Sequence, residues 1–351
     1  IFKTTYFVVV FVIYWLVFQS LKEKGMEKVL KFISISITLY TIIIFIAGIT
    51  GTAFQSYKYN KVGHVGWFYA GNEIGVILAM GLPILILMAV KYSNIYWIPV
   101  FFAVYSLFSI GTKVGYLALI LTLIIAFIFV TKDYILSKRK IEVVFERKKI
   151  IILSLFLIGS LLYTPFSPIA ENMNIHISLI DSKKQISHQK NDKNIDDEKV
   201  DESDTEIGSE EVKELIYSGR NDFLRMFKEY YNKAPLSQKL FGMGYAGNYI
   251  KNPKLIEMDY HDIFYGFGII GFAIYFIPLI YFLYNVVRQL INRFSQFFRY
   301  ENILILTGCA LGLGVAFMAG HVLTAPSVSY FLAILIAIAL TFYKKSEIQH
   351  K

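Results

Sequence analysis

Long apolar stretches separated by polar connections dominate the chain. An α-helix needs about 20 apolar residues to cross the hydrocarbon core of a bilayer, and nine stretches approach that length. They are residues 4–18, 30–50, 72–90, 94–110, 114–131, 149–165, 263–287, 302–321 and 326–343. The pattern predicts an all-α polytopic membrane protein. Six spans lie in residues 1–164, a large polar loop in 165–262, and three spans with a polar tail in 263–351.

Lysine and arginine gather in alternate connections between these spans. Clusters follow the first, fifth, seventh and ninth spans, within residues 22–31, 132–149, 288–299 and 344–345. Strict alternation puts all four clusters on one side, which the positive-inside rule makes cytoplasmic. The external face then receives residues 51–71, the turn at 111–113, the large loop and the turn at 322–325. Because one missed or invented span would put two clusters on the wrong face, the agreement supports the span count.

Composition supports a membrane protein and excludes other classes. The chain is 56% hydrophobic with a mean hydropathy of +0.52, more apolar than a soluble domain of this length requires. The net charge of +9 is explained by the basic connections, so we expect membrane lipid and no nucleic acid as a partner. The single cysteine, Cys309, excludes an intrachain disulfide and a cysteine-rich metal site. Because the chain begins with Ile1 and has no signal-peptide pattern, we expect a fragment with further spans before it.

The large loop divides into two parts of different character. Residues 181–214 are dense in charge and nearly free of aromatic residues, which predicts a disordered, solvated spacer; a metal-binding or cation-attracting segment is the alternative. From residue 219 onward, apolar residues recur at helical spacing: Phe223, Met226, Phe227, Tyr230 and Tyr231. This predicts an amphipathic helix, ended by Pro235, which lies on the membrane interface or packs on span ends. We expect residues 219–262 to be the catalytic part.

Five short motifs, taken in order, resemble the O-antigen ligase and O-antigen polymerase superfamily. They are Phe68-Tyr69-Ala70-Gly71-Asn72-Glu73, Ser109-Ile110-Gly111-Thr112-Lys113, Ser218-Gly219-Arg220, Leu240-Phe241-Gly242-Met243-Gly244, and His261-Asp262 before a Gly-Ile-Ile-Gly span. The resemblance covers residues from about 65 to the end. Each motif is loose by itself; their order and their placement against the predicted topology carry the resemblance.

The resemblance implies a fold similar to C-type membrane glycosyltransferases and a reaction on lipid-linked glycans. Members of this superfamily transfer or polymerise glycans carried on undecaprenyl diphosphate, at the outer face of the bacterial cytoplasmic membrane and without a metal ion. The implied partners are an undecaprenyl-diphosphate-linked oligosaccharide donor, a glycan acceptor and other polysaccharide-assembly proteins. No cofactor is expected. Capsular or other cell-wall polysaccharide synthesis is the expected process, with ligation to a final acceptor as the alternative.

Three family positions can be placed on this chain. The loop histidine falls on His261, the loop arginine on Arg220, and the basic residue that opens an earlier span on Lys113. Lys113 departs from the more common arginine, and lysine lacks the planar fork that binds a phosphate through two hydrogen bonds. Asp262 also departs, because asparagine often follows the family's histidine. The other candidates for substrate contact are Asp259, Asp262, Glu73 and His321.

Transfer of a sugar from a lipid diphosphate requires a proton acceptor and fixed cations, and residues of these types can supply both. An acceptor hydroxyl must lose a proton as it attacks the anomeric carbon, which suits a histidine. The diphosphate leaving group gains charge, which suits fixed cations. His261 is therefore the candidate general base, with Asp259 or Asp262 orienting it, and Arg220 and Lys113 are candidates to bind the diphosphate. Direct activation of the hydroxyl would invert the anomeric centre.

Each candidate also has a structural explanation. His261 can be an ordinary interfacial residue, and Arg220 can anchor the amphipathic helix. Lys113 can snorkel from a span end. Glu73 can favour a helix N-terminus, and His321 can be a packing residue. The rival function is a transporter or flippase of lipid-linked glycan, which predicts repeated halves and polar groups at the bilayer midplane; a ligand sensor is a third possibility. The candidate residues lie instead at span ends and in one loop, which favours chemistry at the membrane surface.

Overall fold

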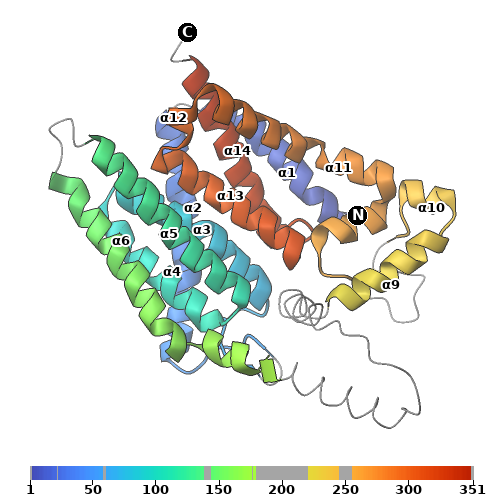
Figure 1. The fold of residues 1–351 in the computed structure, drawn as a ribbon, viewed down its shortest axis with the longest axis horizontal. Coiled ribbons are helices and arrows are strands. Elements are labelled where there is room, and N and C mark those ends of the chain that lie inside the picture. The colour runs from blue at the N-terminus through green and yellow to red at the C-terminus, as the bar shows by residue number, and fades with distance from the viewer. Residues whose placement is uncertain are drawn as a thin grey trace, which may run out of the picture.

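The protein is a bundle of membrane-length helices capped at one end by connecting segments (Figure 1). This computed structural model describes residues 2–21, 23–57, 61–137, 144–175, 177–178, 220–244 and 255–348. Within these ranges the regular structure is helical, apart from one isolated antiparallel bridge between Gln55 and His64. The all-α prediction is confirmed. The predicted spacer at 181–214 lies outside the described residues.

The helices follow the predicted spans closely. Their bounds are α1 Phe2–Gln19, α2 Glu23–Ile49, α3 Gly71–Lys91, the 3-10 turn η1 Asn94–Tyr96, α4 Trp97–Ile110, α5 Lys113–Ser137, α6 Val144–Tyr163, the 3-10 turn η2 Thr164–Phe166, α9 Arg220–Lys233, α10 Leu236–Phe241, α11 Asp259–Asn292, α12 Phe294–Phe297, α13 Tyr300–Met318 and α14 Pro326–Ile348. Seven of the described helices are long and apolar enough to cross a membrane, and two shorter apolar helices cover 94–110 and 326–341. All nine predicted spans therefore form apolar helices.

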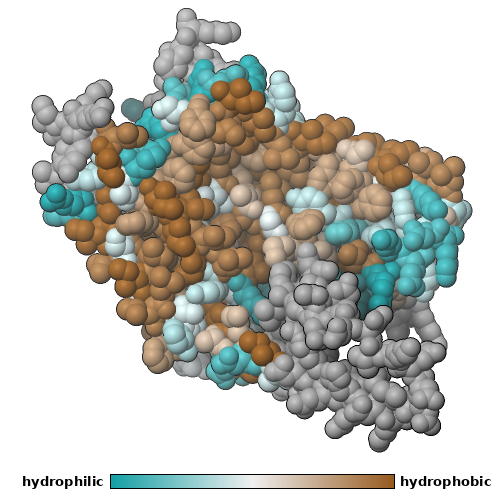
Figure 2. Space-filling view, viewed as in Figure 1, coloured by the Kyte–Doolittle hydropathy of each residue, from teal (hydrophilic) through white to brown (hydrophobic). Residues whose placement is uncertain are grey.

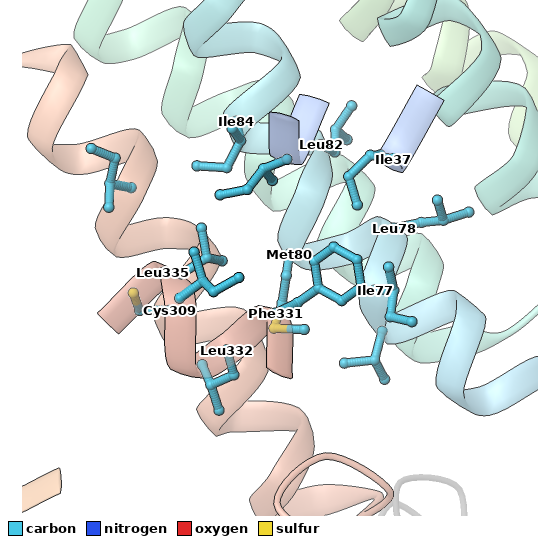
Figure 3. Packing of buried hydrophobic residues seen from close by; sticks show 14 of the residues in the cluster. Ile37, Ile77, Leu78, Met80, Leu82, Ile84, Cys309, Phe331, Leu332 and Leu335 are labelled. Carbon is cyan, nitrogen blue, oxygen red and sulfur yellow. The ribbon is translucent and has the colours of Figure 1, made fainter. Parts of the chain in front are cut away.

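The centre of the bundle is α3. Every residue from Ile74 to Val90 is buried, and the helix contacts α2, α4, α5, α13 and α14. Figure 3 shows side chains of α3 meeting Ile37 of α2 and Phe331, Leu332 and Leu335 of α14. A helix that is apolar on all sides is stable only when neighbours surround it, so α3 is the scaffold on which the other spans are arranged.

Small residues bring α13 close to α3. A Cβ atom on Gly308 would lie 3.0 Å from the carbonyl oxygen of Met80, and one on Gly312 would lie 2.6 Å from the Met80 sulfur. Glycines four residues apart form the small-residue face that allows two membrane helices to approach closely. This contact fixes the last turn of α13 next to the first turns of α3 and α5.

The seventh predicted span is two helical segments instead of one. Helix α11 starts at Asp259, four residues before the predicted start, and Gly268 interrupts it with φ 68° and ψ −174°. A Cβ on Gly268 would lie 2.5 Å from the nitrogen of Gly242, and the nitrogen of Met243 donates to the carbonyl oxygen of Tyr265. The kink therefore makes room for the end of α10, which packs directly on the α11 backbone.

The connecting segments meet at one end of the bundle, which we call the loop end. It contains residues 51–57 and 61–70, the turn 111–112, residues 164–175, helices α9 and α10, and the turn 319–325. At the opposite end, Lys91 pairs with Glu301 at 3.1 Å, and the Asp133 carboxylate accepts from the nitrogen of Tyr300 at 2.8 Å. Figure 2 shows apolar side chains over the flanks of the helices and polar ones near both ends. This surface is typical of a protein that spans a bilayer.

The predicted amphipathic helix is present as α9, and it packs on a span end. Phe227 is buried, and its ring lies 5.9 Å from that of Tyr265. Tyr231 contacts Phe264 and Tyr265 at 5.3 and 5.4 Å between ring centroids. The apolar face of α9 thus covers the first segment of α11, which is the second of the two predicted placements.

Candidate active site

A cavity of about 180 Å³ lies at the loop end, between the first turns of α3 and α5, the last turn of α13 and the start of α9. Three cationic side chains line it: Lys61, Lys113 and Arg220. We call this the basic cavity. Tyr57, Asn72 and Thr112 add polar groups to the wall. The structure therefore brings together Arg220 and Lys113, which are more than a hundred residues apart in the sequence.

One buried amide aligns the segments that carry Lys61 and Lys113. Asn172, which is 3% exposed, accepts a hydrogen bond from the nitrogen of Val62 at 2.8 Å. Its side-chain nitrogen donates to the carbonyl oxygens of Val62 at 2.7 Å and Gly111 at 3.0 Å. Gly111 ends α4 with a left-handed φ of 71°, a conformation that glycine adopts without strain. The two lysines are thus held on neighbouring segments by contacts close to them in sequence.

Arg220 enters the cavity from the other side, as the first residue of α9. Its guanidinium lies 3.5 Å from the Glu257 carboxylate, and its side chain is 15% exposed. Because α9 is packed on α11 through Phe227 and Tyr231, the position of Arg220 depends on that aromatic contact.

The electrostatics of the basic cavity favour an anion. Burial lowers the pKa of Lys61 from its usual value, because the charged ammonium loses solvation. Burial also raises the pKa of Tyr57, while the nearby Arg220 acts in the opposite direction on that phenol. A ligand with negative charge would relieve the repulsion among the three cations and replace their lost hydration.

The wall beside Arg220 contains strained backbone. Glu257 and His321 have left-handed φ angles of 63° and 60°, which are uncommon for residues with a side chain. Gly320, which precedes His321, packs directly on Glu257: a Cβ there would be 2.6 Å from the Glu257 carbonyl oxygen. Such strain persists where surrounding contacts enforce it, and it gathers at functional sites.

Asp259 supplies the enforcing contacts for the turn that contains His321. Its carboxylate is 1% exposed and accepts hydrogen bonds from the backbone nitrogens of His321, Val322 and Leu323 at 3.1, 2.8 and 2.7 Å. The Thr324 hydroxyl donates a fourth at 2.6 Å. The described contacts of Asp259 therefore join α11 to the turn between α13 and α14. The role of Asp259 in orienting His261 stays a prediction. In the structure its carboxylate oxygens hold the turn between α13 and α14.

Asp262 and Glu73 also have structural partners. Asp262 accepts from the nitrogens of Ile256 at 2.9 Å and Met258 at 3.2 Å, which fixes the chain entering α11. Glu73 accepts from the Ser327 hydroxyl at 2.6 Å and so joins the starts of α3 and α14. Neither residue lines the basic cavity as described. Their contact with substrate, like that of His321, stays a prediction.

His261 lies in the first turn of α11, and its ring faces the end of α13. Its ring is 6.3 Å from that of Phe317, and the following residue, Met318, lines the cavity. The residue four positions before it, Glu257, pairs with Arg220. His261 Nδ1 is buried and has no hydrogen-bond partner among the described residues. The described ring contact of His261 is therefore with α13, and the imidazole lies outside the lining of the basic cavity.

Lys61 is the site residue that the sequence analysis did not select. Its signal was present: it is a lysine in a loop predicted to be external, where the positive-inside rule leaves few lysines. A cation on the depleted face is more informative than one in a cytoplasmic cluster. Tyr57 had no such signal, because tyrosines are common at span ends.

The fold and the basic cavity define a polytopic membrane protein with a cavity lined by three cationic side chains at one end of its helix bundle. A family model described as "O-antigen ligase like membrane protein" matches residues 1–346. The chain therefore belongs to this family, which confirms the resemblance in the sequence. No curated protein and no solved structure matches the chain. Membership makes the protein a membrane enzyme that ligates or polymerises glycans. It also implies that the glycan donor is linked to a lipid.

Proposed function

We propose that this protein transfers oligosaccharide from undecaprenyl diphosphate to a glycan acceptor at the outer face of the bacterial cytoplasmic membrane. The observation that carries the proposal is the convergence of Lys61, Lys113 and Arg220, from three separate segments, on one cavity at the loop end. A lipid diphosphate places its charged group at the membrane surface, and these cations lie near the ends of the helices, at the loop end of the bundle. Capsular or other cell-wall polysaccharide is the proposed product.

The cations act on the leaving group. As the bond between the anomeric carbon and the diphosphate oxygen breaks, that oxygen keeps the electron pair and gains negative charge. Fixed cations placed where charge develops stabilise the transition state more than the ground state. Arg220 can bind two phosphate oxygens through its planar fork, while the lysines act as point charges. Glu257 holds the guanidinium without neutralising the cavity, since two lysines remain.

His261 acts on the acceptor. The acceptor hydroxyl oxygen attacks the anomeric carbon, its proton passes to the imidazole, and undecaprenyl diphosphate departs. Because Nδ1 is enclosed, Nε2 is the nitrogen proposed to take the proton. Attack on the face opposite the leaving group inverts the anomeric configuration. The same reaction serves a polymerase, whose acceptor is a second lipid-linked glycan, and a ligase, whose acceptor is the final carrier.

The reaction can be tested with purified protein in vesicles that contain a labelled undecaprenyl-diphosphate-linked oligosaccharide. We expect new glycosidic bonds and one released lipid diphosphate for each bond formed. A ladder of longer lipid-linked products identifies a polymerase, and product formed only with a separate acceptor identifies a ligase. Adding a metal chelator should leave the rate unchanged, because side-chain cations carry the compensating charge. Inhibition that a divalent cation reverses would contradict the metal-free scheme, and transport of intact donor without bond formation would favour a flippase.

A further inference from the structure

We propose that a groove between α4 and α6 holds the polyprenyl chain of the lipid-linked donor. The proposal relies on the proposed function for the identity of that donor. The groove has a volume of about 680 Å³, within the range of known ligand sites. Its walls are mainly aliphatic and aromatic, with Phe101, Val104 and Phe108 from α4 and Ile152, Leu155 and Phe156 from α6. Such a surface suits a hydrocarbon chain.

The groove occupies the half of the bundle nearest the loop end. Its lining runs over residues 101–109 of α4 and 152–163 of α6, which at about 1.5 Å per residue corresponds to roughly 12 and 16 Å. A leaflet of the hydrocarbon core is about 15 Å thick. The groove lining is therefore about as long as one leaflet is thick, and it lies in the half of the bundle nearest the basic cavity.

Two short segments join the groove to the basic cavity. His64 lines the groove and Lys61, three residues earlier, lines the cavity. Ser109 lines the groove and Thr112, three residues later, lines the cavity. The two segments are bonded to each other, because the nitrogen of His64 donates to the carbonyl oxygen of Ser109 at 2.7 Å. A chain in the groove would thus end beside the two segments that also carry Lys61 and Lys113.

Two polar atoms in the groove wall favour a ligand whose apolar chain carries a polar group at one end. His64 Nδ1 and Ser160 Oγ are buried, and each is without a hydrogen-bond partner in the described part of the chain. Buried polar groups are normally satisfied, so both are suited to an oxygen atom or water carried by a bound molecule. A hydrocarbon chain that ends in a phosphate meets this need.

Charge distinguishes the donor from ordinary membrane lipid. Any acyl chain could fill the apolar part of the groove, and a single phosphate on a zwitterionic lipid would gain little from three cations. A diphosphate carries more negative charge and a longer head group, so it gains more from Lys61, Lys113 and Arg220. The groove and the basic cavity together therefore favour a lipid diphosphate.

Gly159 allows the groove to be blocked without disturbing the fold. It lines the groove, and a Cβ there would meet no described atom within 4 Å. Gly159→Phe should therefore fill the groove while keeping α6 intact, since most residues favour a helix more than glycine does. Gly314 in α13 is a matched control, because it is exposed, its Cβ also meets nothing within 4 Å, and it does not line the groove.

The experiment compares donors that carry the same glycan on an undecaprenyl or a geranyl diphosphate. For Gly159→Phe we expect KM for the undecaprenyl donor to rise at least about tenfold, which corresponds to about 1.4 kcal/mol. KM for the geranyl donor and kcat should be unchanged, and Gly314→Phe should match the wild type with both donors. Equal losses with both donors, or equal effects of the two phenylalanine variants, would overturn the proposal.

A binding measurement separates this proposal from the proposed reaction. Photoactivatable undecaprenyl monophosphate, which carries no glycan, should label peptides from α4 and α6 in the wild type and much less in Gly159→Phe. Labelling of these peptides in a protein that transfers no glycan would support the groove and refute the reaction. Labelling that lies elsewhere, or that excess phosphatidylglycerol removes as effectively as unlabelled undecaprenyl monophosphate, would refute the groove.

Discussion

Replacing His261 with glutamine is expected to lower the rate of glycan transfer by at least about a hundredfold, the usual size of a general-base contribution. Glutamine keeps much of the volume and polarity of histidine and cannot accept a proton near neutral pH. Donor affinity should change little, because the imidazole lies outside the lining of the basic cavity. The loss should therefore appear in kcat.

The control for His261 concerns its packing. The ring contacts Phe317 at 6.3 Å, so a Phe317→Leu variant alters the same contact and leaves the imidazole in place. Single-turnover rates, donor affinity and membrane abundance are measured for both variants. We expect Phe317→Leu to retain most of the activity. A His261→Gln protein with the wild-type rate at equal abundance would remove His261 from the mechanism, and equal losses in both variants would indicate packing alone.

Replacing Arg220 with alanine is expected to reduce kcat/KM by about a hundredfold, or about 2.7 kcal/mol. The change removes the cation that can bind two phosphate oxygens at once. It leaves Lys61 and Lys113, which bind phosphate only as point charges. Arg220→Lys should fall between the wild type and Arg220→Ala. Arg225→Ala is the matched control, because Arg225 is on the same helix with a side chain that is 77% exposed.

A second variant separates binding from anchoring, since Arg220 also pairs with Glu257 at 3.5 Å. Glu257→Gln breaks this ion pair and leaves the guanidinium in the cavity. If Arg220 binds the diphosphate, Glu257→Gln should retain donor affinity. If the arginine serves only to fix α9 on the segment before α11, the two variants should lose activity to the same extent, and that result would contradict the proposed role.

The helices were predictable because their signal is local. Apolar length alone located the nine spans, and the spacing of Phe223, Phe227 and Tyr231 located α9. The kink in α11 was not predictable in the same way. Gly268 is one of several glycines in an apolar run, and its left-handed φ is explained by the close approach of Gly242 from the preceding loop. No local sequence pattern indicates that these two segments lie close together.

The candidate site was predictable only in part. The family motifs identified Arg220 and Lys113, and the structure places both in one cavity. The orienting role predicted for Asp259 or Asp262 beside His261 stays a prediction. The bonds from Asp259 to the turn at 321–324, about sixty residues away, were not predicted. Lys61 joins the cavity through Asn172, which lies 110 residues from Val62. Contacts over such separations depend on the packing of whole helices, which a single sequence does not specify.

The central claim is that the basic cavity binds the diphosphate of the donor. The most direct measurement is the affinity of the purified protein for undecaprenyl diphosphate and for undecaprenyl monophosphate, with wild type and Lys61→Gln compared. The account predicts that the wild type binds the diphosphate at least about tenfold more tightly, and that Lys61→Gln loses most of this preference while still binding the monophosphate. Equal affinities in the wild type, or a preference that Lys61→Gln leaves intact, would contradict it.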